Sequence, residues 1–195
     1  MTDRSGFPAI GAAVRGGVDW VQFRDRSLDG SELLAALAEA RAACGEAPVR
    51  WLVNRRVDLA WAAGADGVHL GFDGMPVDDA RALLGSQALI GIACHTPEEV
   101  CAADPDLSYV HLAPIHTPLS KPASRPPLGT AALERAAAAG VPILAQGGVT
   151  AANARRCIQA GAAGVAVTGE ILGAADPERA ARALREALDH DKGSE

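Results

Sequence analysis

The chain has 195 residues, of which 49% are hydrophobic and 22% charged, enough for one globular domain with a full core. Its net charge of −6 offers no basic surface for nucleic acid or anionic membranes, so we expect neither as a partner. No apolar run could span a bilayer and no signal-like leader opens the chain, which predicts a cytoplasmic protein. The four cysteines lack metal-ligand spacing and are expected to be reduced structural thiols.

Short apolar strands alternate with alanine- and leucine-rich segments of helical periodicity along the chain. Residues 1–17 have the pattern of a strand-end loop followed by a helix. Seven strands are predicted after it, over residues 18–23, 49–54, 67–70, 89–94, 109–112, 142–145 and 164–167. Helices are predicted between them, over 31–44, 56–64, 77–85, 97–104, 130–140 and 150–161. This alternation indicates an α/β protein with a parallel sheet.

Seven strands without a long polar interruption favour a (β/α)8 TIM-type barrel whose first strand is short or missing at the N-terminus. Residues 1–189 are predicted to form this single domain, and residues 190–195 a tail. A missing strand would expose the edges of 18–23 and 164–167, which natural proteins rarely leave bare. We therefore expect a stub from residues 1–3, a partner chain such as a second copy in a homodimer, or residues upstream of Met1 to cover them.

Polar side chains recur near the carboxyl ends of the predicted strands, where barrel enzymes keep their active sites. Strand alternation turns them away from apolar neighbours such as Phe23, Val68 and Leu70. The set consists of Gln22, Arg24, Arg26, Asn54, His69 and His111. Their convergence favours a catalytic site over a solvated rim of ion pairs.

Two glycine-containing turns follow the last two predicted strands. Gly147 and Gly148 come after residues 142–145, and Thr168 and Gly169 come after residues 164–167. Glycine lets the backbone approach an anion, and N–H groups at a helix start then face it. Paired turns of this kind predict a phosphate pocket.

The longest predicted loop, residues 113–128, is rich in proline and follows a strand. Loops of this length in a compact domain are usually functional, and in a barrel this one would lie over the carboxyl ends of the strands. It carries His116, Ser120 and Lys121, the last being the one lysine within the body of the predicted fold.

The segments QFRDR, VNRRVDLA, GADGVHLG, PLSK, GGVTAANA and AGAAGVAV occur in an order and spacing that resemble the thiamine-phosphate synthase and thiazole tautomerase superfamily. The resemblance implies a thiamine-biosynthesis barrel that binds a hydroxyethylthiazole phosphate. Its synthase branch joins this thiazole to an aminopyrimidine diphosphate, releasing diphosphate with the help of Mg²⁺. Its tautomerase branch shifts a proton on a thiazole carboxylate phosphate without a metal.

The resemblance also assigns residues by position. It implies a thiazole-phosphate pocket at Gly147, Gly148, Thr168 and Gly169, and a diphosphate clamp formed by Gln22, Arg24, Arg26, Asn54 and Lys121. Ser120 stands where the family has a phosphate-binding threonine, and His69 occupies the position of the family histidine.

The chain departs from the synthase pattern at the metal site. Two Mg²⁺-binding aspartates of the family are replaced here by Arg55 and Gly74, and Phe72 and Ala93 replace a glutamine and a serine. Asp73 is displaced by one residue and could reach a metal only if the turn were rebuilt. Because hard cations bind carboxylate oxygens and an arginine repels them, we expect no metal bound in the family's way.

Synthase-type transfer is the main prediction, with Arg24, Arg26, Arg55 and Lys121 neutralising the diphosphate in place of the metal. A metal-independent tautomerase-like enzyme is the second interpretation, although the catalytic histidine of that branch aligns with Pro114. The bases that could replace it are His69, His95, His111 and His116. A non-catalytic thiazole-phosphate binding protein is the third. Cys94 is expected to pack under a helix and is not proposed as a nucleophile.

Overall fold

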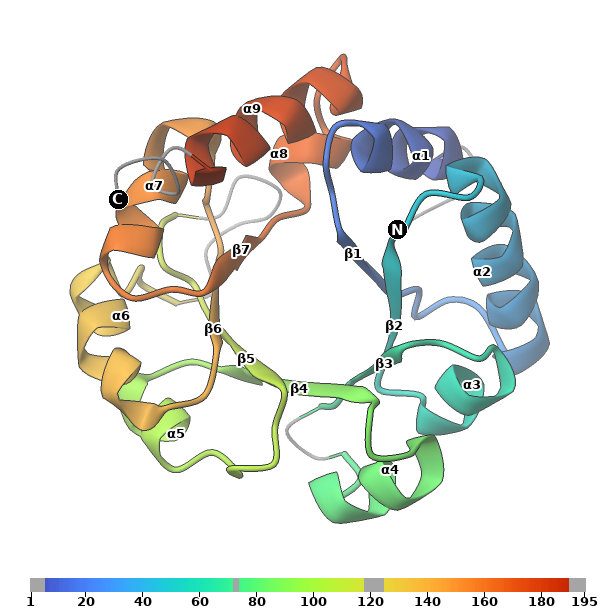
Figure 1. Ribbon diagram of the computed structural model, residues 1–195, viewed down its shortest axis with the longest axis horizontal. Helices are drawn as coiled ribbons and strands as arrows, with labels where there is room; N and C mark the ends of the chain where they lie inside the picture. Colours follow the sequence, from blue (N-terminus) through green and yellow to red (C-terminus); the bar gives the residue numbers. More distant parts are fainter. Residues whose placement is uncertain (1–5, 72–73, 118–124, 190–195) are drawn as a thin grey trace.

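The computed structural model describes residues 6–71, 74–117 and 125–189, in which strands and helices alternate (Figure 1). The strands are β1 (Trp20–Phe23), β2 (Arg50–Asn54), β3 (Gly67–His69), β4 (Leu89–Cys94), β5 (Tyr109–Leu112), β6 (Ile143–Gln146) and β7 (Gly164–Ala166). The helices are α1 (Phe7–Arg15), α2 (Gly30–Cys44), α3 (Val57–Ala62), α4 (Val77–Leu84), α5 (Pro97–Cys101), α6 (Ala131–Ala136) with the short 3-10 helix η2 (Ala137–Ala139), α7 (Ala151–Gln159), α8 (Gly169–Leu172) and α9 (Pro177–Asp189).

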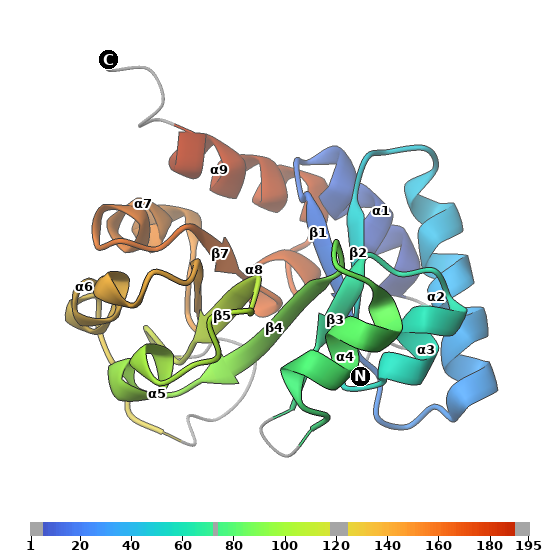
Figure 2. The same cartoon turned by 60° about the horizontal axis from the view of Figure 1, so that its bottom comes forward.

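All strands are parallel and pair in the order of the sequence, from β1 to β7. Figures 1 and 2 show that the sheet curls around a central axis with the helices on its outside. The predicted α/β barrel is confirmed. Its seven strands leave β1 and β7 without a ladder between them in the described residues, and α1, α8 and α9 pack against one another along that side.

The first described element is α1, so no strand precedes β1 between residue 6 and Trp20. Residues 1–3, expected as a stub of the missing strand, and the tail 190–195 lie outside the described residues. The predicted strands lie within two residues of those observed. The largest difference is at β1, because the backbone N–H of Val18 donates to the Ala13 carbonyl (3.2 Å) and so ends helix α1 rather than joining the sheet.

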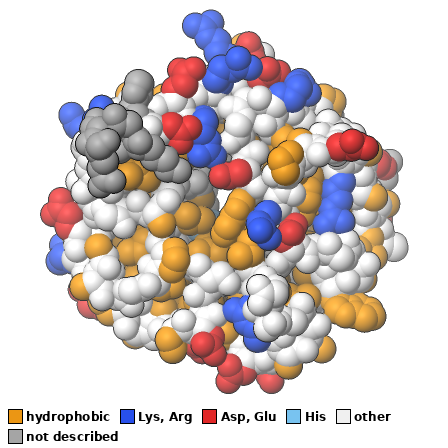
Figure 3. Space-filling model, viewed as in Figure 1, with side chains coloured by type: hydrophobic (Ala, Val, Ile, Leu, Met, Phe, Trp, Pro, Cys, Tyr) orange, Lys and Arg blue, Asp and Glu red, His pale blue; other side chains and the backbone are white. Residues whose placement is uncertain are grey.

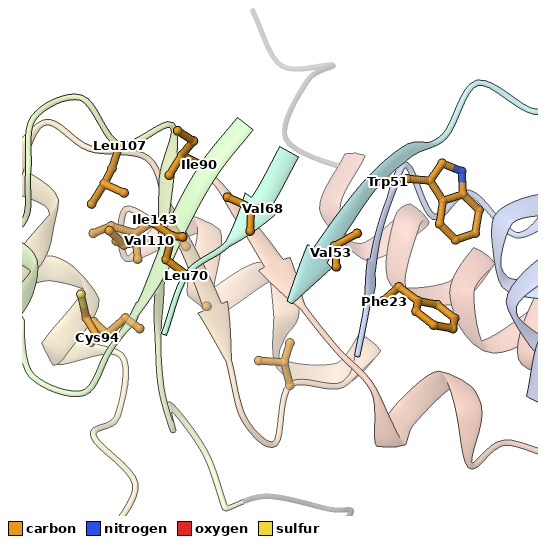
Figure 4. Close-up of a cluster of buried hydrophobic side chains, with 14 of the residues drawn as sticks. Phe23, Trp51, Val53, Val68, Leu70, Ile90, Cys94, Leu107, Val110 and Ile143 are labelled. Carbon is orange, nitrogen blue, oxygen red and sulfur yellow. The ribbon is translucent and has the colours of Figure 1, made fainter. Parts of the chain in front are cut away.

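The main hydrophobic core lies between the outer face of the sheet and the helices. Successive strands contribute alternate apolar side chains to it, among them Phe23, Val53, Val68, Ile90 and Val110 (Figure 4). Each of these five side chains is at most 2% exposed. The predicted outward direction of Phe23 and Val68 is therefore confirmed, and it fixes the intervening polar residues on the opposite face.

The inner face of the sheet carries aromatic and polar side chains. Trp20 on β1 meets Tyr109 on β5 edge-on, with ring centroids 5.4 Å apart, although these strands are not neighbours in the sheet. His69 and His111 lie beside Tyr109, and their ring centroids are 4.4 Å apart. Contacts between distant strands place these side chains inside the barrel, so its interior is a polar and aromatic layer.

Gly91 makes room for this layer. A Cβ at Gly91 would lie 2.2 Å from the Tyr109 ring, so no other residue fits unless that ring moves.

Outside the barrel, no helix among the described residues is long and apolar enough to cross a membrane. Acidic and basic side chains are interspersed over the face shown in Figure 3.

Gly91→Ala is expected to destabilise the fold by about 1–3 kcal/mol, because the new methyl group overpacks against the Tyr109 ring. The free energy of unfolding from urea titration measures this. Gly30→Ala is the matched control, since a Cβ there meets its nearest atom at 3.5 Å, an ordinary van der Waals distance. Equal stability of the two variants would contradict the packing described for Gly91.

Candidate active site

The carboxyl ends of β1 and β2 place basic side chains around a cavity. Asn54 ends β2, and its Nδ2 donates to Oε1 of Gln22 on β1 (3.1 Å). The cavity has a volume of about 440 Å³ and is lined by Arg24, Asp25, Arg26, Leu28, Leu33, Asn54, Arg55 and Arg56. Partial burial lowers the pKa of Arg24, and the positive charges of Arg26 and Arg55 lower it further. The site is therefore rich in positive charge and suited to a polyanion.

Arg55, the residue at the family's first aspartate position, has a φ of +65°, the left-handed region that side chains other than glycine rarely adopt. Its N–H donates to the His69 carbonyl at 2.8 Å, so the backbone is held against β3. The guanidinium lies over Gly71, where a Cβ would be 2.2 Å from one of its nitrogens. Because Gly71 has no side chain, the Arg55 side chain can lie across the end of β3.

His69 and His111 lie deeper, inside the barrel, and each is about 5% exposed. Nδ1 of His69 is 3.0 Å from the Tyr109 hydroxyl. Burial lowers the pKa of His69 to about 3, with His111 and Arg24 adding to the effect. Burial also lowers the pKa of His111 to about 4, against a hydrogen bond to Gln146 that raises it. Both imidazoles are therefore neutral near pH 7.

The Gly147–Gly148 turn ends β6 as predicted, and both residues have positive φ angles, of 89° and 60°. The segment after β5 lies directly on this turn. His116 donates its N–H to the Gly147 carbonyl at 2.9 Å, and a Cβ at Gly148 would lie 2.2 Å from the Thr117 carbonyl oxygen. Glycine is required here both for the backbone conformation and for the close approach of the neighbouring loop.

Thr168 and Gly169 stand at the start of α8, one strand further along the sheet. Thr168 is exposed, and its carbonyl accepts from the Leu172 N–H at 2.9 Å. Since Gln146 pairs with Ala166, both turns lie at the same end of neighbouring strands. Asn153, in the first turn of α7, donates from Nδ2 to the Gly148 carbonyl (3.0 Å) and fixes the start of that helix on the glycine turn.

Two further histidines border the segment after β5, which begins with a cis Ala113–Pro114 peptide bond. Nδ1 of His95 donates to the Ala113 carbonyl (2.9 Å), and the His95 N–H donates to Glu99 (2.6 Å). Nε2 of His116 lies 3.9 Å from the Cys157 sulfur, and burial lowers the pKa of His116.

Cys94 is 1% exposed in the core, where burial raises the pKa of its thiol to about 11, as its predicted packing requires.

The structure groups the predicted residues into two sets at one end of the sheet. Asn54 and the arginines line the cavity at β1 and β2, Gln22 accepts a hydrogen bond from Asn54, and the glycine turns lie at β6 and β7. The predicted residues Asp73, Ser120 and Lys121 lie outside the described residues. Gly74 is described, and its N–H donates to the Gly71 carbonyl (2.9 Å) in a tight turn.

The side chains in the described ranges do not fit the family's metal site. No group of three or more His, Cys, Asp or Glu residues is close enough there to hold a metal ion. At the family's first aspartate position stands the Arg55 guanidinium, a cation, and at the second stands Gly74, which has no side chain. Neither can ligate Mg²⁺, which prefers carboxylate oxygens.

Sequence reasoning missed three side chains of the interior: Trp20, Tyr109 and Gln146. Trp20 lies two residues before Gln22, and Tyr109 two residues before His111, so each points to the same face of the sheet as the predicted residue. Gln146 lies two residues after Leu144, the partner of His111 on β6, and points to the same face. Strand parity was therefore the signal that could have found them. Tyr109 and Trp20 read as ordinary apolar strand residues, because aromatic side chains are common in strands.

A family model described as thiamine monophosphate synthase matches residues 2–171. The chain belongs to the thiamine-phosphate synthase family. A thiamine-phosphate synthase from Chlorobium limicola is 42% identical over 188 residues, covering 94% of this chain and 90% of the relative. One from Methanoculleus marisnigri is 43% identical over 178 residues, covering 90% and 84%. The protein is accordingly a transferase of thiamine biosynthesis, and the predicted family is confirmed.

Solved structures agree with this family assignment. A thiamine phosphate pyrophosphorylase from Pyrococcus furiosus superposes with a TM-score of 0.84 at 26% identity, covering 96% of this chain and 91% of the other. A 3-hexulose-6-phosphate synthase superposes with a TM-score of 0.69 at 24% identity, covering 95% and 94%, which shows a shared barrel fold alone.

The two interior histidines predict a pH dependence of stability. Their pKa values of about 3 and about 4 in the fold lie below the ordinary 6.5, so below pH 6.5 the unfolded chain binds protons that the folded chain does not. The free energy of unfolding is then expected to fall as the pH drops from 6.5 towards 4, by up to about 1.4 kcal/mol per pH unit and histidine. Urea titrations across this range measure the slope.

His111→Gln isolates the effect, because glutamine keeps a hydrogen-bonding side chain but does not titrate. Its slope between pH 6.5 and 5 is expected to be shallower than that of the wild type, and at pH 7.5 both slopes should be flat. Parallel curves over the whole range would refute the assignment of His111 as a neutral buried group.

Proposed function

We propose that this protein forms thiamine phosphate from an aminopyrimidine diphosphate and a hydroxyethylthiazole phosphate, with guanidinium groups acting where relatives of the synthase branch use Mg²⁺. Membership of the thiamine-phosphate synthase family supports the reaction. A metal-independent reaction is supported by one observation: Arg24, Arg26 and Arg55 line a single cavity at the carboxyl ends of β1 and β2.

The reaction breaks the bond between the pyrimidine methylene carbon and the diphosphate oxygen, and the electron pair leaves with the diphosphate. The thiazole nitrogen then donates its electron pair to that methylene carbon, which forms the new C–N bond. Negative charge therefore develops on the leaving diphosphate. Positioned cations stabilise such charge best in a site that excludes water, and arginine binds phosphate oxygens in bidentate fashion.

The second substrate would bind at the glycine turns. The phosphate of the thiazole meets backbone N–H groups at Gly147–Gly148 and at Thr168–Gly169, which neighbouring strands place at one end of the sheet. Ser120 and Lys121 remain part of the proposed diphosphate clamp by resemblance to the family.

Product formation with and without metal tests the proposal. Purified protein, freed of metal by chelation, is supplied with both substrates, once with Mg²⁺ and once with excess chelator. Thiamine phosphate is expected in both samples at rates within about tenfold, since cation charge is supplied by the protein. Product only with Mg²⁺ would mean that Asp73 or another acid binds the metal. No product in either sample, despite thiazole-phosphate binding, would favour a tautomerase-like enzyme or a non-catalytic binder.

Variants at Arg55 test its role in charge neutralisation. Arg55→Asn removes the charge but tolerates the left-handed backbone, and it is expected to lower kcat/KM by about 10²–10³-fold. Arg50→Gln is the matched control, since Arg50 begins β2, at the opposite end of the strand from the cavity, and its guanidinium pairs with Asp66 at 3.6 Å. The control should stay within about threefold of the wild type, because a surface ion pair contributes little. Similar losses in both variants would remove Arg55 from the mechanism.

A further inference from the structure

A chain of hydrogen bonds crosses the interior of the barrel. Nδ2 of Asn54 on β2 donates to Oε1 of Gln22 on β1 at 3.1 Å. The Tyr109 hydroxyl on β5 lies 3.0 Å from Nδ1 of His69 on β3, and the Gln22 side chain acts on the same phenol, opposing the burial that raises its pKa. The chain therefore connects four strands, and it ends at the histidine that the family resemblance singles out.

The donors and acceptors of this chain follow in one direction. The Gln22 carbonyl oxygen accepts from Asn54, and the Gln22 side chain lowers the pKa of the Tyr109 phenol against the larger effect of burial, as a group that donates to the phenol oxygen does. The phenol has a single hydrogen, and Nδ1 of His69 is the acceptor within reach of it. Since a neutral imidazole has one protonated nitrogen, the proton of His69 is then on Nε2.

The Tyr109 ring is held in place by its surroundings. Its own strand partner is Gly91, which leaves room for the ring, and Trp20 contacts it edge-on at an interplanar angle of 75°. On the other side His69 stacks on it at an interplanar angle of 29°. Tyr109 is only 2% exposed, so water does not compete for its hydroxyl.

We propose that Tyr109 is a positioning residue, which holds His69 in the tautomer with the proton on Nε2 and so makes it a neutral hydrogen-bond donor to the bound substrate. The tautomer follows from the order of donors and acceptors in the interior, and its use on a substrate rests on the proposed function. His111 from β5 and Arg24 beyond β1 are the basic groups that act on His69, and together with burial they disfavour its protonation.

Nitrogen NMR of protein labelled with ¹⁵N-histidine tests the tautomer without substrate. In the wild type at pH 7, the His69 ring is expected to show an unprotonated Nδ1 and a protonated Nε2. Tyr109→Phe keeps the ring over Gly91 and removes the donor, so the His69 signals should shift towards a mixture of both tautomers. A protonated Nδ1 in the wild type, or unchanged His69 signals in Tyr109→Phe, would overturn the proposal.

Ser108→Ala is the matched control, since it removes a hydroxyl from the residue just before Tyr109, which begins β5. The Ser108 Oγ accepts from the Ile90 N–H (3.0 Å) and is not part of the interior chain. The His69 signals of this variant should match the wild type, whereas a shift equal to that of Tyr109→Phe would show a general disturbance of the strand and overturn the proposal.

Kinetics of thiamine phosphate formation test the use of the tautomer. Tyr109→Phe is expected to lower kcat about 10- to 100-fold, as loss of an orienting partner does, with KM changed less than threefold. Ser108→Ala should keep wild-type kcat. An unchanged kcat in Tyr109→Phe would overturn the link between tautomer and substrate. Absence of turnover in the wild type would instead count against the proposed function, while the NMR result still decides the role of Tyr109.

Discussion

The strict alternation of side chains along parallel strands organises everything else in this barrel. Because neighbouring strands pair in register, apolar residues such as Phe23, Val53 and Val68 all face the helices. The intervening residues must then face the axis, where the sheet curls them towards one another. This single constraint separates a water-free apolar core outside the sheet from a polar and aromatic layer inside it, and the second layer is where chemistry becomes available.

The carboxyl ends of β1 and β2 gather positive charge around one cavity. Partial burial lowers the pKa of Arg24, and the nearby positive charges of Arg26 and Arg55 lower it further, which a bound polyanion would relieve. Arg55 also holds an uncommon left-handed backbone. Strain of this kind persists where the surroundings fix it, here through the His69 carbonyl and Gly71.

Glycines at four positions act by making room for a specific neighbour. Gly71 leaves space for the Arg55 guanidinium, Gly91 for the Tyr109 ring, and Gly147 and Gly148 for the segment after β5. The first two lie beside the arginine cavity and the interior histidines, and the last two form the expected phosphate turns. The two proposed substrate subsites are therefore shaped as much by missing side chains as by the polar groups present.

Local patterns in the sequence predicted the strands to within two residues and the inward direction of His69, since the side-chain direction in a strand depends only on neighbouring residues. The motifs around Arg55 and Gly74 also showed that these residues stand where the family has aspartates. They also located the glycine turns. The tertiary structure decided the rest: the packing of α1, α8 and α9 along the predicted gap between β1 and β7, and the interior contacts from Asn54 to His69. These contacts join strands distant in sequence, and only the curvature of the sheet brings Tyr109 within 3.0 Å of a histidine forty residues before it.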